Sequence, residues 1–405
     1  MAVASDKRAA EAGAHDLSAA LRLAGLALKK RKERGSWVVP RVLISGYYGF
    51  GNCGDEAMLL AIITQLRNAL PEVDIVVLSA RPADTAQNFG VKAVPRRHLA
   101  SVWRELCRAD LLLSGGGSLF QDVTSRGNVL YYALLVLGAK LLGKKVCLYG
   151  QGIGPLSRFF SRWLVKQVVR LADLVTLRDE DSALELERLG VRRPLYVTAD
   201  PVLALEMGGK KEQGREILRQ AGVGEGKILG ISLRPWPRVE EAREAVADLA
   251  RHLREEGWQV VLVPFHPDDI QILSPLREKI EGAVLLSSGL SFQEAVGVLS
   301  HLTCAVGMRL HFLIFAAMAG VPGVGLSYDP KVDRFMNQVG LPSLPLAPLS
   351  AEELLRAVKG LLAEEEEVRL WLRQRVAELS QRAALDARLV ARLLTSDKGK
   401  GEKHP

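Results

Sequence analysis

The chain has 405 residues, of which 48% are hydrophobic and 25% are charged, and its formal net charge is +8. This composition is that of a globular protein too long for one ordinary core, and it excludes wholesale disorder. No apolar run reaches the roughly 20 residues that a membrane-spanning helix needs. The four cysteines are scattered without a CxxC pair, which argues against a zinc site and favours a reducing compartment. We therefore expect a two-domain cytoplasmic protein.

Residues 1–39 carry a large share of the charge, with eight basic and four acidic residues. They lack the order of a signal peptide. Leu17, Leu21 and Leu28 fall on one helical face, and Lys29 opens a run of four basic residues. We predict a basic amphipathic extension over residues 1–39. Two alternatives stay open: an interfacial helix beside anionic lipid, or a helix packed on the body or a frayed tail.

Strands and helices are expected to alternate over residues 40–205. Apolar runs predict strands at 41–45, 74–79, 111–114, 145–149 and 174–177, with helices at 55–70, 129–142 and 158–172. Continuous apolar strands that alternate with helices indicate a parallel sheet covered on both faces. Residues 40–205 are therefore predicted to form an N-terminal Rossmann-like lobe.

The same pattern restarts after residues 206–227, a polar stretch rich in Gly and Lys that we predict to be an interdomain linker. Strands are expected at 228–233, 259–264, 283–286, 303–306 and 321–326, with helices at 238–257, 268–280, 291–300 and 309–319. Residues 228–345 are thus predicted to form a C-terminal Rossmann-like lobe. A helical strap at 346–396 and a disordered tail at 397–405 complete an α/β fold with N- and C-terminal helical extensions.

Glycine-rich loops follow three of the predicted strands of the first lobe, where ligands of such sheets bind. Glycines permit close backbone approach, and consecutive backbone N–H groups can hold an anion or a sugar. Tight turns with Asp55 as a helix cap are the alternative. The candidate acceptor- or anion-binding residues of these loops are Gly49, Asn52, Asp55, Gly115, Gly116, Gly117, Gln151, Gly152 and Gly154.

Basic side chains also stand at strand ends. Arg178 lies where a strand becomes a helix, although a surface ion pair with Asp179 or Asp181 would explain it as well. In the second lobe, Arg234 and His266 follow strands. His266 precedes a proline and is therefore held extended, so it either faces the cleft or packs within its loop.

The sharpest signal is Gly307-Met308-Arg309-Leu310-His311, which opens an otherwise apolar helix. Two basic side chains at the positive end of a helix are costly unless an anion binds there. Arginine binds a carboxylate or phosphate with two hydrogen bonds, and histidine can exchange a proton near neutral pH. Lys331 supplies another cation after the next strand. A core histidine with satisfied hydrogen bonds is the alternative.

The segments GYYGFGNCGDEAML, GGGSLFQD, YGQGIGP, LRDEDS and GMRLHFLIFAAMAGVPGVGLSYDPK, over residues 40–345, resemble the bacterial polysaccharide pyruvyl transferases, in particular their CsaB-like branch. The resemblance implies a glycosyltransferase-B-like fold with two Rossmann-like lobes facing across a cleft. It also implies transfer of pyruvate from phosphoenolpyruvate to two hydroxyls of a sugar as a cyclic ketal, releasing phosphate. In that branch the acceptor is N-acetylmannosamine of a lipid-linked cell-wall precursor, and the finished polymer anchors S-layer proteins.

The resemblance assigns Arg309, Leu310 and His311 to the donor site, with His311 as acid/base, and matches Arg178 to a second donor-binding arginine. Phosphoenolpyruvate bears a carboxylate and a phosphate, so Lys331 is a further donor-binding candidate. Neither a metal nor a cofactor is expected, phosphoenolpyruvate being a co-substrate. A lipid-linked acceptor would place the protein at the inner membrane face.

Two other functions stay open: a nucleotide-sugar glycosyltransferase of the same fold, and a non-catalytic carbohydrate- or anion-binding protein. Nucleic-acid binding is disfavoured, because the basic excess is terminal and lacks interleaved aromatic residues.

Overall fold

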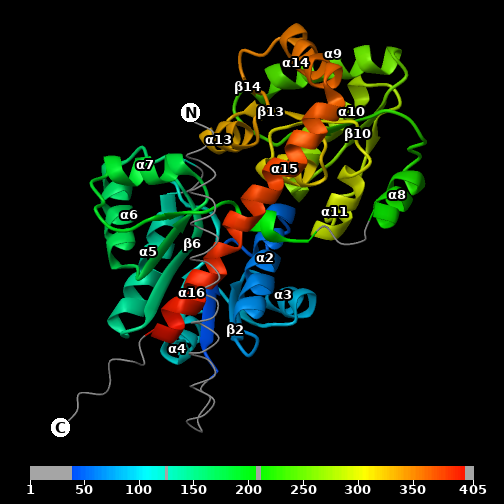
Figure 1. Ribbon diagram of the computed structural model, residues 1–405. Helices are drawn as coiled ribbons and strands as arrows, with labels where there is room; N and C mark the ends of the chain where they lie inside the picture. The colour runs from blue at the N-terminus through cyan, green and yellow to red at the C-terminus, as the bar shows by residue number, and fades with distance from the viewer. Residues whose placement is uncertain (1–38, 124–125, 207–210, 397–405) are drawn as a thin grey trace, which may run out of the picture.

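The structure is a computed structural model, which describes residues 39–123, 126–206 and 211–396. The predicted extension (apart from Val39), the predicted tail at 397–405 and residues 207–210 of the predicted linker lie outside these described residues. The chain forms two α/β lobes, each built on a parallel sheet, with a run of C-terminal helices that joins them (Figure 1).

The first lobe holds an eight-stranded sheet in the order β3-β2-β1-β4-β6-β7-β8, with β5 paired to β6. Its strands are β1 (Arg41–Ser45), β2 (Asp74–Ser79), β3 (Lys92–Pro95), β4 (Leu111–Ser114), β5 (Gly117–Phe120), β6 (Lys145–Ile153), β7 (Leu174–Leu177) and β8 (Tyr196–Val197). Alternate strand residues face opposite sides. Ile44 packs toward α2 (Cys53–Ala69), whereas Leu43 packs toward the other face.

The helices of that other face are α4 (Leu99–Arg108), α5 (Arg126–Leu141), α6 (Phe159–Leu171) and α7 (Glu180–Arg188). Helix α3 (Pro82–Phe89) joins β2 to β3, and the short helix η1 (Pro201–Ala204) ends the lobe. The sheet is therefore covered on both sides, which explains why its strands are continuously apolar.

The second lobe has six parallel strands in the order β11-β10-β9-β12-β13-β14. They are β9 (Ile228–Ser232), β10 (Gln259–Leu262), β11 (Val284–Leu285), β12 (Cys304–Gly307), β13 (Gly323–Ser327) and β14 (Ser343–Pro345). The helices are α8 (Lys211–Gln220), α9 (Val239–Glu255), η2 (Pro267–Asp269), α10 (Ile270–Lys279), α11 (Phe292–Leu299), α12 (Leu310–Met318) and α13 (Pro330–Val339). The strand order reverses between β1 and β4 in the first lobe and between β9 and β12 in the second. Ligands of doubly wound folds bind at such points.

Two predicted segments take a more specific form. Helix α8 occupies part of the predicted linker and packs on α11, because neither Gly214 nor Gly297 has a side chain between the two helices. The predicted strap consists of three helices: α14 (Ala351–Ala363), α15 (Glu365–Ala383) and α16 (Leu385–Thr395). Helix α14 packs on α9 of the second lobe, and α16 packs on α2 of the first (Figure 1).

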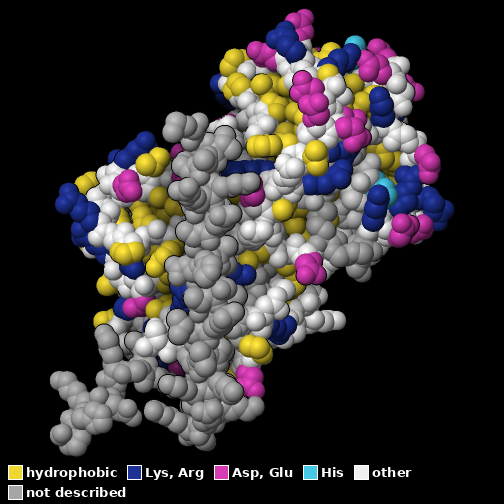
Figure 2. Space-filling view, in the orientation of Figure 1, with side chains coloured by type: hydrophobic (Ala, Val, Ile, Leu, Met, Phe, Trp, Pro, Cys, Tyr) yellow, Lys and Arg dark blue, Asp and Glu magenta, His cyan; other side chains and the backbone are white. Residues whose placement is uncertain are grey.

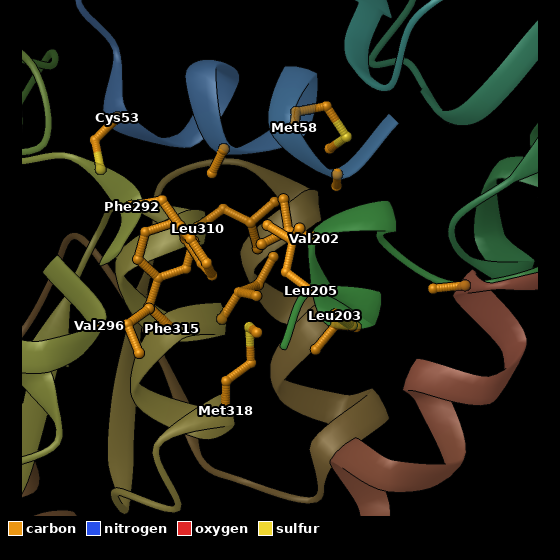
Figure 3. Packing of buried hydrophobic residues seen from close by; sticks show 14 of the residues in the cluster. Cys53, Met58, Val202, Leu203, Leu205, Phe292, Val296, Leu310, Phe315 and Met318 are labelled. Carbon is orange, nitrogen blue, oxygen red and sulfur yellow. The ribbon is translucent and has the colours of Figure 1, made fainter. Parts of the chain in front are cut away.

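The two lobes share one hydrophobic core. Met58 of α2 and Val202 of η1 belong to the same buried cluster as Phe292, Leu310 and Phe315 of the second lobe (Figure 3). A backbone hydrogen bond of 2.9 Å from Cys53 N to Phe265 O also joins the lobes. Packing of this kind fixes where the N-terminus of α2 lies relative to that of α12.

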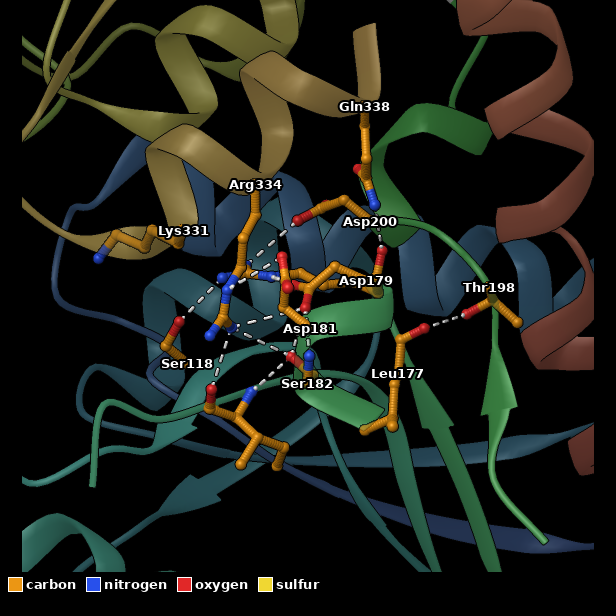
Figure 4. Close-up of polar contacts among 12 residues, drawn as sticks. Ser118, Leu177, Asp179, Asp181, Ser182, Thr198, Asp200, Lys331, Arg334 and Gln338 are labelled. Atoms are coloured by element: carbon orange, nitrogen blue, oxygen red, sulfur yellow. Dashed lines mark hydrogen bonds and ion pairs between the residues drawn. The ribbon is translucent and has the colours of Figure 1, made fainter. Parts of the chain in front are cut away.

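Polar contacts from α13 join the lobes a second time (Figure 4). Arg334 Nη1 donates to Ile153 O at 3.2 Å and lies 3.5 Å from Asp179 Oδ1, and Gln338 Nε2 donates to Arg178 O at 3.1 Å. In the described part of the chain, no helix is both long and apolar enough to cross a bilayer.

Candidate active site

A cleft of about 500 Å³ lies between the lobes, at the ends of the strands where the order of each sheet reverses. Ten of the residues predicted for the site line it: Asn52, Asp55, Gly117, Arg178, Arg234, His266, Arg309, Leu310, His311 and Lys331. They come from both lobes and from segments almost 280 residues apart. The fold thus brings the predicted donor-site residues together.

His311 stands in the first turn of α12 and touches the other lobe. A Cβ atom at Gly54 of α2 would lie 2.1 Å from His311 Nδ1, so only glycine leaves room for the ring. His311 Nε2 lies 3.9 Å from Asp200 Oδ2 and has no hydrogen-bond partner among the described residues. The ring nitrogen nearest the first lobe's carboxylate is therefore free to receive or give a proton.

We call Arg178, Arg309 and Lys331 the cation triad. Burial lowers the pKa of His311 to about 4, helped by the cation triad and opposed by Asp200. The imidazole is consequently neutral at pH 7 in the protein without a ligand. An anion bound to the cation triad would offset their charges and raise this pKa.

Arg178 is almost fully buried where β7 passes into α7, and its guanidinium is held on several sides. Its Nη2 donates to Ser118 Oγ at 2.9 Å, and its Nη1 lies 3.4 Å from Asp200 Oδ2. A Cβ atom at Gly152 would lie 2.7 Å from Arg178 Nε. Asp200 therefore approaches both Arg178 and His311, and links the two predicted donor-site residues across the lobes.

Arg309 is oriented by a carboxylate that the solvent does not reach. Asp269 accepts from Arg309 Nε, and also from the backbone N–H groups of Phe265 and His266 at 3.0 Å each. A second bond joins Arg309 Nη2 to the same carboxylate. Asp269 engages Nε and Nη2, so Nη1 is the nitrogen that this carboxylate leaves for a ligand.

The remaining cations of the cleft lie around Tyr328. Lys331 Nζ is 5.1 Å from the centre of the Tyr328 ring and 3.3 Å from Asp329 Oδ2. Arg234 Nη1 donates to the Tyr328 hydroxyl at 3.0 Å. Burial of the phenol raises the pKa of Tyr328, but the charges of Lys331 and Arg234 outweigh this effect, so the pKa lies below its ordinary value. This wall of the cleft is suited to an anion.

The pKa values of His266 and Asp55 are shifted from those of the free side chains. His266 Nδ1 accepts from Asp268 N at 3.1 Å, which leaves the proton on Nε2. Burial and the charge of Arg309 lower the pKa of His266. Burial and the neighbouring Glu56 raise the pKa of Asp55 to about 7, although the cation triad acts in the opposite direction. Asp55 is therefore a cleft carboxyl that can hold a proton near neutral pH.

The structure corrects part of the prediction for the glycine-rich loops, because most of the residues predicted there to bind an acceptor or anion do not line the cleft. A Cβ atom at Gly115 would meet the Tyr48 hydroxyl at 2.0 Å, and one at Gly116 would meet Met58 Sδ at 2.5 Å. These two glycines serve the packing of the first lobe, and only Gly117 of the three faces the cleft.

The other residues predicted for these loops also have structural partners, and Gln151 and Gly152 lie within β6 rather than in a loop. The buried Gln151 donates to the carbonyls of Ser114 and Gly115. Gly152 lies beneath Arg178, and Gly154 N donates to Phe120 O at 3.0 Å. Gly49 lines a separate hollow between α2, α3 and the loop before α11.

Several residues that line the cleft or hold its side chains were not predicted. Asp200 and Asp269 lie behind the cleft and contact Arg178, His311 and Arg309. Each stands before a helical turn, where the sequence alone indicates only a helix cap. Arg96, which follows β3, lies 5.4 Å from the ring of Phe50, and Phe50 stacks on Tyr47 at 4.0 Å. No group of three or more His, Cys, Asp or Glu side chains in the described segments is arranged to hold a metal ion.

The architecture is that of the glycosyltransferase-B-like α/β proteins. The UDP complex of MnaA from S. aureus superimposes with a TM-score of 0.65 at 13% identity, covering 90% of this chain and 99% of that one. UDP-GlcNAc 2-epimerase from Methanocaldococcus jannaschii gives a TM-score of 0.63 at 14% identity, covering 89% and 100%. At these identities the likeness shows the fold alone, and it confirms the predicted fold class.

A family model described as polysaccharide pyruvyl transferase matches residues 52–330. The amylovoran biosynthesis protein AmsJ of Erwinia amylovora is 23% identical over 425 residues, which cover 88% of this chain and 98% of AmsJ. The chain belongs to the polysaccharide pyruvyl transferase family, as the sequence motifs indicated. It is thus a transferase of polysaccharide synthesis.

Proposed function

We propose that the protein transfers pyruvate from phosphoenolpyruvate to two hydroxyls of a sugar, forming a cyclic ketal and releasing phosphate. The observation that carries this proposal is the convergence of the cation triad on His311 in one cleft. Phosphoenolpyruvate has a carboxylate and a phosphate, and two guanidinium groups and an ammonium group can donate hydrogen bonds to both. The donor needs no cofactor in this scheme.

In the proposed reaction His311 gives a proton to the methylene carbon of the donor, which becomes the methyl group of the ketal. The oxygen of one sugar hydroxyl bonds to the adjacent carbon, and its proton returns to His311. The oxygen of the second hydroxyl then bonds to the same carbon as the bond to phosphate breaks, and phosphate leaves with the electron pair. The second hydroxyl proton passes to Asp55 or to solvent.

The pKa of about 4 for His311 makes donor binding a condition for protonation. Without a bound donor, His311 is a neutral imidazole at pH 7 and has no second proton to give. A bound anion reverses that balance, and Asp55, which follows the glycine that touches the ring, is a source for the proton. This order would restrict proton transfer to the occupied site.

For the acceptor, we propose N-acetylmannosamine of a lipid-linked cell-wall precursor whose polymer anchors S-layer proteins. The first-lobe side of the cleft supports a saccharide, because it combines the stacked Tyr47 and Phe50 rings with the polar side chains of Asn52 and Asn128. We place the reaction at the cytoplasmic face of the membrane.

The test is incubation of the purified protein with phosphoenolpyruvate and a lipid-linked saccharide ending in N-acetylmannosamine, with phosphate release and ketal formation as readouts. We expect His311→Ala to abolish turnover and to leave donor binding mostly intact, whereas His252→Ala, at an exposed position outside the cleft, stays active.

Near-normal turnover of His311→Ala would refute the assigned role. Parallel reactions with UDP-sugars address the alternatives. UDP release in place of phosphate release would indicate a nucleotide-sugar glycosyltransferase, a possibility raised by the fold shared with the UDP complex of MnaA. Binding without either product would indicate a non-catalytic protein.

A further inference from the structure

Three helices of the outer layer of the first lobe, α4, α5 and α6, expose large apolar side chains. On α5, Leu130, Leu134, Leu137 and Leu141 are exposed, and the last of them has 84% of its surface accessible. Their spacing places them on one face of the helix. The opposite face of α5 packs on the sheet through Val129 and Val136. Helix α5 is therefore apolar on both sides, and the described residues cover only one of them.

The neighbouring helices extend this surface. Phe159 and Phe160 at the start of α6 are 85% and 59% exposed, and the Phe160 ring stacks on Trp163 at 6.0 Å. Trp103 of α4 lies beside α5, since a Cβ atom at Gly138 would be 3.7 Å from its ring. Helix α5 packs against both α4 and α6, so their exposed apolar residues are neighbours, and we call them together the outer patch. Figure 2 shows apolar side chains at the surface of the first lobe, among Lys and Arg side chains. Contiguous apolar patches mark interaction sites.

The outer patch lies in a strongly basic part of the chain. Residues 97–172 contain eleven Lys or Arg and three Asp or Glu. Two of these acids are buried, Glu105 with Lys92 and Arg41, and Asp122 at the start of α6. The cations at positions 104, 162 and 170 are exposed on the same helices, and Arg158 is exposed directly before α6. The surface therefore combines aromatic and aliphatic side chains with positive charge.

This chemistry fits one occupant. We propose that the outer patch is a docking surface for an anionic lipid bilayer, with Phe159, Phe160 and Trp163 inserted at the level of the headgroups. Tryptophan and phenylalanine on a basic surface are typical of interfacial membrane binding. A second copy of the chain would bring one basic surface against another, and residues 1–39, with eight basic and four acidic residues, are also positive. Both are repelled where anionic lipid is attracted.

The position of the outer patch supports the assignment. Asn128 lines the cleft and stands two residues before Leu130, and Arg97 lines it two residues before Leu99 of α4. The apolar helices thus begin at the mouth of the cleft. A bilayer on this surface would present the head of a membrane lipid to the site. The docking surface itself does not depend on the proposed reaction.

The experiment is flotation of the full-length chain with vesicles of phosphatidylcholine and phosphatidylglycerol, and with vesicles of phosphatidylcholine alone. We expect binding to the anionic vesicles that weakens with added salt. The double variant Phe159→Ser/Phe160→Ser should lose about tenfold in partitioning for each phenylalanine. The control is Leu184→Ser/Leu370→Ser, which removes two exposed apolar residues outside the outer patch and should bind as the wild type does.

Sedimentation velocity and phosphate release accompany the flotation. The variant should keep the wild-type sedimentation coefficient and its phosphate release with a water-soluble saccharide, because both phenylalanines are exposed and lie outside the cleft. Undiminished vesicle binding by the variant would overturn the proposal and indicate residues 1–39 as the anchor. So would an absence of wild-type binding, or a dimer that the substitutions dissociate. If the variant lost vesicle binding as expected but the wild type released no phosphate, only the proposed pyruvyl transfer would be refuted, and the docking surface would stand.

Discussion

Replacing Gly54 by alanine tests the position of His311 without touching any charged group. The added Cβ would lie 2.1 Å from Nδ1, 2.4 Å from Cγ and 2.7 Å from Cβ of His311, far inside van der Waals contact. The ring must therefore move by about 1 Å or more. Misplacement of a catalytic group by about 1 Å costs about a hundredfold in rate. We expect kcat for phosphate release to fall by about that factor, and phosphoenolpyruvate binding to change by less than about tenfold.

The fold should tolerate this substitution, which makes the test specific. Alanine in a helix is about 1 kcal/mol more favourable than glycine, and this gain offsets part of the overpacking cost of about 1–3 kcal/mol. Gly360 of α14 is the matched control, because a Cβ atom there has open space and the position is also helical. Gly360→Ala should raise the Tm slightly and leave kcat unchanged. If Gly54→Ala were as active as Gly360→Ala, the contact between α2 and His311 would have no catalytic role.

Three further predictions concern the surroundings of the cleft. Gly152→Ala should raise KM for phosphoenolpyruvate about tenfold or more by displacing the Arg178 guanidinium, and an unchanged KM would remove Arg178 from the donor site. Asp269→Ala should lower the free energy of unfolding in urea by about 3–5 kcal/mol, since it leaves the largely buried Arg309 unpaired; a change below about 1 kcal/mol would contradict this. Burial raises the pKa of Asp55 from 3.8 to about 7, so this carboxyl stabilises the fold below about pH 4 and that contribution is lost as the pH rises through 7. Asp55→Asn should accordingly gain stability relative to the wild type between about pH 4 and 8, and parallel curves would refute the raised pKa.

Much of the architecture could be predicted because it depends on local pattern. Strands that are apolar on both faces, such as Leu111–Ser114, are buried between two helix layers, so such runs predict parallel sheets. Two of the missed strands, β3 and β8, are short, partly exposed and at the edges of the sheet, so they carry little apolar signal. Helix α8 was missed because its composition is polar, with only Gly214 and Leu218 buried.

The candidate site was predictable where a residue is unusual for its local environment. Arg309 and His311 open an apolar helix, and that conflict required a ligand or a partner. In the structure the partner of Arg309 is Asp269. No local sequence pattern indicates this pair, because Asp269 lies 40 positions earlier in the chain. The glycines were ambiguous for a related reason. A glycine that admits a ligand and one that admits a neighbouring side chain, as Gly116 admits Met58, look the same until the tertiary packing is known.

The core that continues from α2 into α11 and α12 has a consequence for how this protein folds. Two lobes with separate cores could melt independently, but here Met58 and Phe315 belong to one buried cluster, to which helices of the C-terminal strap also contribute. Neither lobe alone would cover its half of that cluster. Unfolding should therefore be a single cooperative transition, and a lobe expressed by itself would present the apolar face of α2 or α12 to water. A chimera with a related protein should therefore exchange both lobes together, because a single transferred lobe would lose its half of the shared core.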